Sequence, residues 1–115
     1  MATALQSNSS LTSLFLCNNR IGDEGAQHLA TALQSNSSLT SLYLRSNRIG
    51  KAGAQHLATA LQSNSSLTQL NLQHNEIEND ISEIVIAESL TRNQDNHLKR
   101  QEMLMTLLFS YLFHS

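Results

Sequence analysis

Residues 3–30 read TALQSNSSLTSLFLCNNRIGDEGAQHLA, and residues 31–58 read TALQSNSSLTSLYLRSNRIGKAGAQHLA. These two 28-residue units are identical at 23 positions, and a third copy, TALQSNSSLTQLNLQHNEI, begins at Thr59 and diverges after Ile77. Self-similarity at a fixed period of roughly 20–50 residues is typical of solenoids, in which each unit packs only against its neighbours. The repeat therefore decides the fold, and every other residue is interpreted from its place in the unit.

Each unit carries the pattern L-x-x-L-x-L-x-x-N-x-I. Leu14 and Leu16 alternate with period two, which predicts a short strand with both leucines facing inward. Asn19 follows where the chain turns, and an inward asparagine can satisfy buried backbone groups of a loop. Residues 25–33 then have apolar side chains at helical spacing, and QSNSS at 34–38 predicts a polar turn before the next strand.

A single unit cannot bury its leucines, whereas stacked units bury them in one continuous core. We therefore predict an α/β fold, a solenoid of repeats. A short parallel sheet would line its concave face, and the helices would form its convex face.

The three in-register copies resemble the ribonuclease-inhibitor class of leucine-rich repeats, which includes the repeat regions of NOD-like receptors and Ran GTPase-activating proteins. The resemblance covers residues 1 to about 90, most of the chain. It implies a module that binds another protein through its concave strand face. It does not identify the partner, because the class is used on many unrelated targets.

The chain divides into leucine-rich repeats at residues 1–90, about three units, and a C-terminal helical cap or tail at residues 91–115. Met1 aligns with Leu29, so the chain begins within a repeat helix and no capping unit precedes the first strand. We expect either self-association through this uncapped N-terminal end or a fragment of a longer array with no independent function. For residues 91–115, three interpretations stay open: a terminal helix over the open core, a helix that binds a partner or a membrane surface, and a disordered tail.

The first two units differ at only five pairs of positions, and two of these pairs, Phe15/Tyr43 and Cys17/Arg45, are outward strand positions. Aromatic residues and arginine are the usual energetic anchors of protein interfaces. The alternative is drift, because solvent-facing positions tolerate change. We predict a partner-binding surface on the strands formed by Phe15, Cys17, Tyr43, Arg45, Gln69, Asn71 and Gln73.

Composition excludes several other kinds of partner. The net charge is −2 and no basic stripe is present, so we expect no nucleic-acid partner. The longest apolar stretch, residues 103–113, is too short to span a bilayer as a helix, and the N-terminal residues do not read as a secretory signal. The lone Cys17 cannot form an intrachain disulfide. We therefore expect an intracellular protein, cytoplasmic in location.

The sequence contains none of the catalytic motifs considered below. We find no glycine-rich phosphate loop, no paired cysteines and no nucleophile elbow, so we predict no enzyme activity, catalytic residue or cofactor. His28 and His56 occupy equivalent positions without a third ligand, so we predict no metal site. The alternative function is regulation of a small GTPase. Ran GTPase activators act through a loop arginine, and Arg20 and Arg48 lie in the repeat loops.

Overall fold

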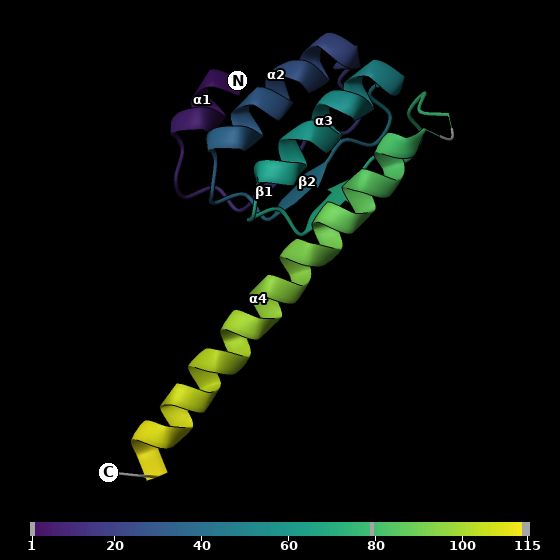
Figure 1. Cartoon of the computed structure of the whole chain (residues 1–115). Coiled ribbons are helices and arrows are strands. Elements are labelled where there is room, and N and C mark those ends of the chain that lie inside the picture. The colour runs from purple at the N-terminus through teal and green to yellow at the C-terminus, as the bar shows by residue number, and fades with distance from the viewer. Residues whose placement is uncertain (1, 79, 114–115) are drawn as a thin grey trace.

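A strand, a loop and a helix recur along the chain in the order that the repeat predicts (Figure 1). The computed structural model describes residues 2–78 and 80–113, so the outer ends of the two predicted domains, Met1 and residues 114–115, lie outside the described residues. The elements are α1 (Ala2–Ser7), β1 (Ser13–Phe15), α2 (Gly22–Ser35), β2 (Ser41–Tyr43), α3 (Lys51–Ser63), β3 (Gln69–Asn71) and α4 (Ile81–Phe113).

The three strands form one parallel sheet in the order β1-β2-β3. Equivalent repeat positions pair directly, so that Leu14 lies opposite Leu42 and Leu42 opposite Leu70. The helices form a second layer, in which α1 contacts α2, α2 contacts α3 and α3 contacts α4 (Figure 1). The predicted α/β solenoid with a short parallel sheet is confirmed.

The core lies between the sheet and the helices and is most complete in the middle unit. Leu42 and Leu44 of this unit are fully buried, whereas the equivalent Leu14 and Leu16 of the first unit are only partly buried. The middle unit has a neighbour on both sides, and an end unit has a neighbour on one side only. Fully buried Ala26 and other small residues let neighbouring helices pack closely.

The repeated asparagine of the motif joins successive loops through hydrogen bonds. The Asn47 side-chain oxygen accepts from the backbone N–H groups of Asn19 at 2.8 Å and Ile21 at 3.4 Å. Its amide nitrogen donates to the carbonyls of Leu16 at 2.7 Å and Arg45 at 3.2 Å. The expected role of this asparagine, satisfying loop backbone groups from an inward position, is confirmed for Asn47. For Asn19 it is wrong, because this residue of the end unit is exposed and its side chain bonds the Cys17 carbonyl.

A second row of asparagines lies in the QSNSS turns, where the sequence predicted only a polar turn. Asn36 and Asn64 are 4% and 3% exposed. The Asn64 side chain donates to the carbonyls of Leu33 and Asn36, and its oxygen accepts from the backbone N–H groups of Ser66 and Leu67. The turn sequence therefore holds one unit to the unit before it.

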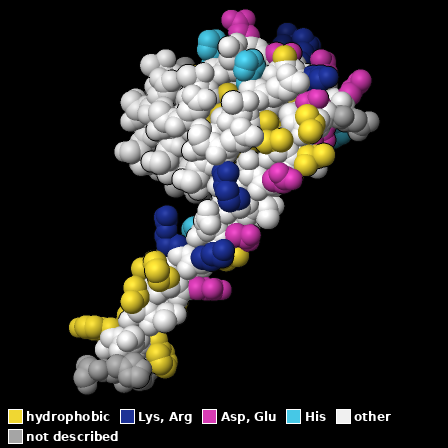
Figure 2. All heavy atoms as spheres, in the orientation of Figure 1, with side chains coloured by type: hydrophobic (Ala, Val, Ile, Leu, Met, Phe, Trp, Pro, Cys, Tyr) yellow, Lys and Arg dark blue, Asp and Glu magenta, His cyan; other side chains and the backbone are white. Residues whose placement is uncertain are grey.

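Helix α4 is continuous across the boundary drawn after residue 90. Its first three turns pack against α3 through a buried stripe of Ser82, Ile86, Ser89 and Asn93, spaced three or four residues apart. The Asn93 side chain donates to the carbonyls of Asn64 and Leu67, and so continues the second asparagine row. The next residue, Gln94, donates from its side chain to the Thr68 carbonyl. The last turns of the helix extend away from the repeats, and apolar side chains gather along them (Figure 2).

Arg92 closes the end of α3. Its guanidinium donates to the carbonyls of Leu61 at 2.8 Å and Asn64 at 2.9 Å, and also bonds the Asn93 side chain. We expect Arg92→Ala to lower the free energy of unfolding by about 1–2 kcal/mol, because helix-end carbonyls lose a charged donor. Chemical denaturation measures this, with the exposed Arg100→Ala as the matched control. Equal effects of the two variants would contradict the assigned role.

Candidate protein-binding face

The outward side chains of β1 and β2 meet as an aromatic pair. The rings of Phe15 and Tyr43 are stacked, with centroids 4.5 Å apart and planes 3° apart. The two residues are direct partners in the strand register, which follows from the 28-residue repeat. Phe15 is 69% exposed, so a large apolar surface faces solvent in a fixed geometry.

Gln69 of β3 holds the Tyr43 side chain on the side opposite to β1. The Tyr43 hydroxyl donates to the Gln69 side-chain oxygen at 3.1 Å, and the Ser41 hydroxyl donates to the same oxygen at 3.1 Å. In the strand register Tyr43 lies between Phe15 and Asn71. The tyrosine hydroxyl, however, bonds diagonally to Gln69 and not to Asn71.

Asn71 turns toward its own backbone. Its side-chain oxygen accepts from the Gln73 N–H at 2.9 Å, and Asn71 is half-buried. The third strand therefore exposes Gln69 more than Asn71.

Cys17, Arg45 and Gln73 follow the strands as an exposed second row. Backbone bonds hold this row together, since the Asn18 N–H donates to the Arg45 carbonyl and the Ser46 N–H to the Gln73 carbonyl. The Cys17 thiol is exposed, with its sulfur 3.9 Å from the Tyr43 carbonyl oxygen. Arg45 forms no ion pair with any residue that the structure describes. Its guanidinium is therefore available to a partner.

The loops after the strands contain residues in the left-handed backbone region, which is uncommon outside glycine. Arg20 and Arg48, the loop arginines behind the GTPase alternative, have φ of 51° and 57° and are exposed. The asparagine row described above holds these loops, because Asn47 and Asn75 each accept two backbone N–H groups from the preceding unit. The conformation of these loops is therefore set by the repeat itself.

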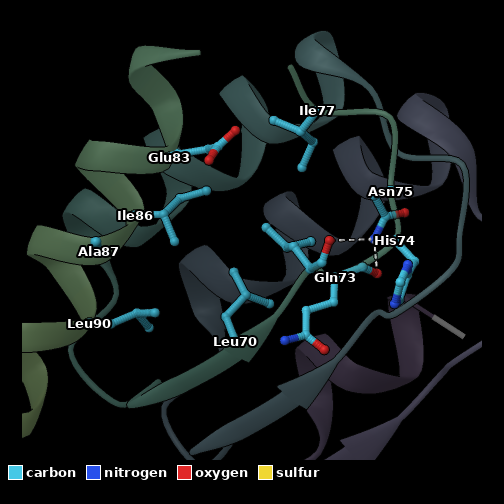
Figure 3. A pocket seen from close by; sticks show the side chains of 10 residues that line it. Leu70, Gln73, His74, Asn75, Ile77, Glu83, Ile86, Ala87 and Leu90 are labelled. Carbon is cyan, nitrogen blue, oxygen red and sulfur yellow. Dashed lines mark hydrogen bonds between the residues drawn. The ribbon is translucent and has the colours of Figure 1, made fainter. Parts of the chain in front are cut away.

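A cleft of about 430 Å³ opens at the C-terminal end of the core, between β3, its loop and α4 (Figure 3). Nothing in the repeat pattern predicts this cleft. Its wall on the repeat side includes Leu70, Leu72 and Ile77, and its wall on α4 includes Ile86 and Leu90. These side chains would be covered by a further repeat in a longer array. A second hollow, of about 410 Å³, lies between the strand face and α4, lined by Tyr43, Thr68, Gln69, Leu70, Asn71, Leu90 and Gln94.

Within residues 2–78 and 80–113, no group of three or more His, Cys, Asp or Glu residues could hold a metal ion. His28, for which no metal-binding role is predicted, is exposed, and its Nε2 lies 3.9 Å from Glu24 Oε1 on the same helix. No helix within these described ranges is long and apolar enough to cross a membrane.

The chain is similar, to different degrees, to two solved structures. A solved structure described as Leiomodin-1 Actin-Binding Site 2 is similar at a TM-score of 0.69 and 24% identity, covering 95% of this chain and 78% of its own. The tropomodulin C-terminal domain of Caenorhabditis elegans gives a TM-score of 0.41 at 10% identity, covering 87% of this chain and 95% of its own. No curated protein matches the chain.

The family comparison rests on the repeats themselves. The model for the leucine-rich repeat matches residues 7–30, 35–58 and 63–81, one match for each unit. Repeats of this family generally mediate protein interactions. The chain belongs to the leucine-rich-repeat family.

Proposed function

We propose that this chain is a protein-interaction module that binds its partner through the concave strand face. The observation that carries the proposal is the stacked pair of Phe15 and Tyr43, which is exposed and held in place by the strand register and by Gln69. Large aromatic side chains dominate binding energy at interfaces. A surface that is already ordered loses little conformational entropy on binding.

The surroundings of the aromatic pair also suit an interface. Productive interfaces combine an apolar centre with a polar rim. Ser41, Gln69 and Arg45 supply polar and charged groups around the pair. The proposed contact set is Phe15, Cys17, Tyr43, Arg45, Gln69, Asn71 and Gln73.

We assign the repeats to the ribonuclease-inhibitor class. The support is the 28-residue period together with a full helix in each unit, 14 residues in α2 and 13 in α3. A lone exposed thiol at Cys17 suits a reducing compartment, so we place the interaction inside the cell.

Actin is the first partner to test, because the Leiomodin-1 structure is described as an actin-binding site. The likeness at 24% identity concerns the fold, and folds of this kind serve many targets. Isothermal titration of the full chain with monomeric actin gives a direct answer. If no heat of binding is found, affinity capture with wild type and the Tyr43→Ala variant in parallel identifies partners that depend on this face.

We expect Tyr43→Ala and Arg45→Ala each to weaken partner binding by about 1–3 kcal/mol, because they remove an aromatic anchor and an unpaired guanidinium. Calorimetric titration with the partner measures the loss of binding free energy. The melting temperature of each variant should hardly change. His56→Ala, on the exposed side of α3, is the matched control and should bind as wild type does. Unchanged affinity in both strand variants would reject this surface.

A further inference from the structure

The part of α4 beyond Asn93, called distal α4 here and comprising residues 94–112, displays much apolar surface to solvent (Figure 2). Nine of its described large apolar residues are between 50% and 78% exposed: Leu98, Met103, Leu104, Met105, Leu107, Leu108, Phe109, Tyr111 and Leu112. At roughly 150 Å² for a large side chain, this amounts to on the order of 800 Å² of exposed apolar surface. The largest patch on a typical monomer is roughly 300–600 Å². Distal α4 therefore presents more apolar surface than a solitary molecule usually does.

One side of α4 connects this surface to the open end of the core. Residues that follow one another at spacings of three or four lie on one side of a helix. Such a series begins at the cleft and ends near the C-terminus: Ala87, Leu90, Gln94, Leu98, Gln101, Met105, Leu108 and Leu112. Ala87 and Leu90 line the cleft, as Figure 3 shows. At the start of this side, the Gln94 amide donates to the Thr68 carbonyl of the same chain. Beyond Gln94 this side continues outward as an exposed strip of Leu98, Met105, Leu108 and Leu112, interrupted by Gln101.

The molecule therefore has two uncovered apolar surfaces, the cleft and distal α4. It cannot join them itself, because α4 is one unbroken helix from Ile81 to Phe113 and contains neither glycine nor proline. In Figure 1 the C-terminal turns of α4 extend away from β3 and the loop after it, whose side chains line the cleft. Each surface must be covered, if at all, from another molecule.

We propose that a second copy of this chain covers both surfaces, through antiparallel pairing of the two α4 helices. With a two-fold axis near the middle of the helix, around His97, distal α4 of each copy lies against the cleft of the other. The arrangement is reciprocal and closed, as in most homodimers. On the paired side, Leu98, Met105, Leu108 and Leu112 expose on the order of 350 Å² at roughly 150 Å² for each side chain, and the apolar walls of the cleft add to this on each partner. The pairing therefore belongs to the small interfaces, which bury less than about 1,200 Å² in total.

The charges of distal α4 favour a protein surface over a lipid surface. Helices that lie in a membrane interface usually carry many Lys and Arg on their polar side. In distal α4, Lys99 and Arg100 are balanced by Asp95 and Glu102, and residues 103–112 carry no charge. A second copy also explains why the strip and the cleft occur on the same side of one helix.

Sedimentation velocity of the full chain tests the pairing directly. We expect a dimer at micromolar concentration and a dissociation constant at least about 100-fold higher for Leu108→Arg, which places a charge on the strip. Thr106→Arg introduces the same side chain within the same helical turn, on the other side, and should remain a dimer. Both residues are exposed, so neither variant should impair folding.

The orientation of the helices is tested by pulsed EPR on Cys17→Ser, Ser110→Cys labelled with a nitroxide. Antiparallel pairing predicts roughly 30–40 Å between the two labels at 1.5 Å per residue, and parallel pairing roughly 10 Å. A monomer at about 100 µM, a dimer insensitive to Leu108→Arg, or the short distance would each overturn the proposal. A monomer that binds phosphatidylcholine–phosphatidylserine vesicles would assign the strip to membranes. Tyr43→Ala should leave the dimer intact, so that failure of the proposed binding face is distinguishable from failure of the dimer.

Discussion

Replacing Leu44 by alanine is expected to lower the free energy of unfolding by about 2–5 kcal/mol. Leu44 is fully buried in the middle unit, between the sheet and the helices, with repeats on both sides. Its truncation removes buried apolar surface and leaves a cavity. The units packed on both sides hold the surrounding side chains in place, so the cavity stays largely open. Because the free energy of unfolding of a small domain is only about 5–15 kcal/mol, this substitution should remove a large part of it.

The repeat provides a matched control for this prediction. Leu16 is the equivalent of Leu44 in the first unit but is only partly buried. Leu16→Ala deletes the same atoms, and its cost should be clearly smaller. Urea denaturation followed by circular dichroism measures both. Similar midpoints for the two variants would show that the middle of the array is not its most tightly packed part.

Asn47→Ala is expected to cost about 2–4 kcal/mol without changing any apolar contact of the core. The side chain is fully buried and makes four hydrogen bonds, two to N–H groups of the preceding unit and two to carbonyls. Alanine would leave these backbone groups without partners in a site that water enters poorly. Each unsatisfied buried group carries its full desolvation cost.

Asn19→Ala is the control, because its only hydrogen bond from the side chain to another described residue is to the Cys17 carbonyl. Asn19 is exposed, so we expect a cost below about 1 kcal/mol. Chemical denaturation of the two variants distinguishes them. Should both cost the same, the asparagine row would not be what holds successive loops together.

The middle of the fold could be predicted from the sequence because its signal is duplicated. Leu14, Leu42 and Leu70 recur in register, and the same alternation that directs them inward directs Phe15 and Tyr43 outward. The bonds of Asn47 and Asn75 to the preceding loops were also predictable, since a polar residue in a buried loop needs backbone partners. Asn19 is exposed because no described unit precedes its loop.

Other features could not be predicted, for physical reasons. QSNSS has the composition of an exposed turn, and nothing in the composition reveals that Asn36 and Asn64 point inward. The Tyr43–Gln69 bond depends on rotamers that the repeat does not specify. The continuity of α4 was hidden because residues 94–102 are polar except for Leu98 and are all exposed, so no periodicity marks them as helix. The division after residue 90 remains a prediction, although one helix crosses it.

The proposed binding face is tested most directly by mapping the contacts of a bound partner onto the chain. Backbone NMR spectra of the labelled chain, recorded with and without saturating partner, give a shift change for each residue. The account predicts the largest changes in β1, β2 and β3 and in the residues that follow them, centred on Phe15 and Tyr43. Changes confined to the exposed surfaces of α2 and α3, with the strand signals unmoved, would contradict it.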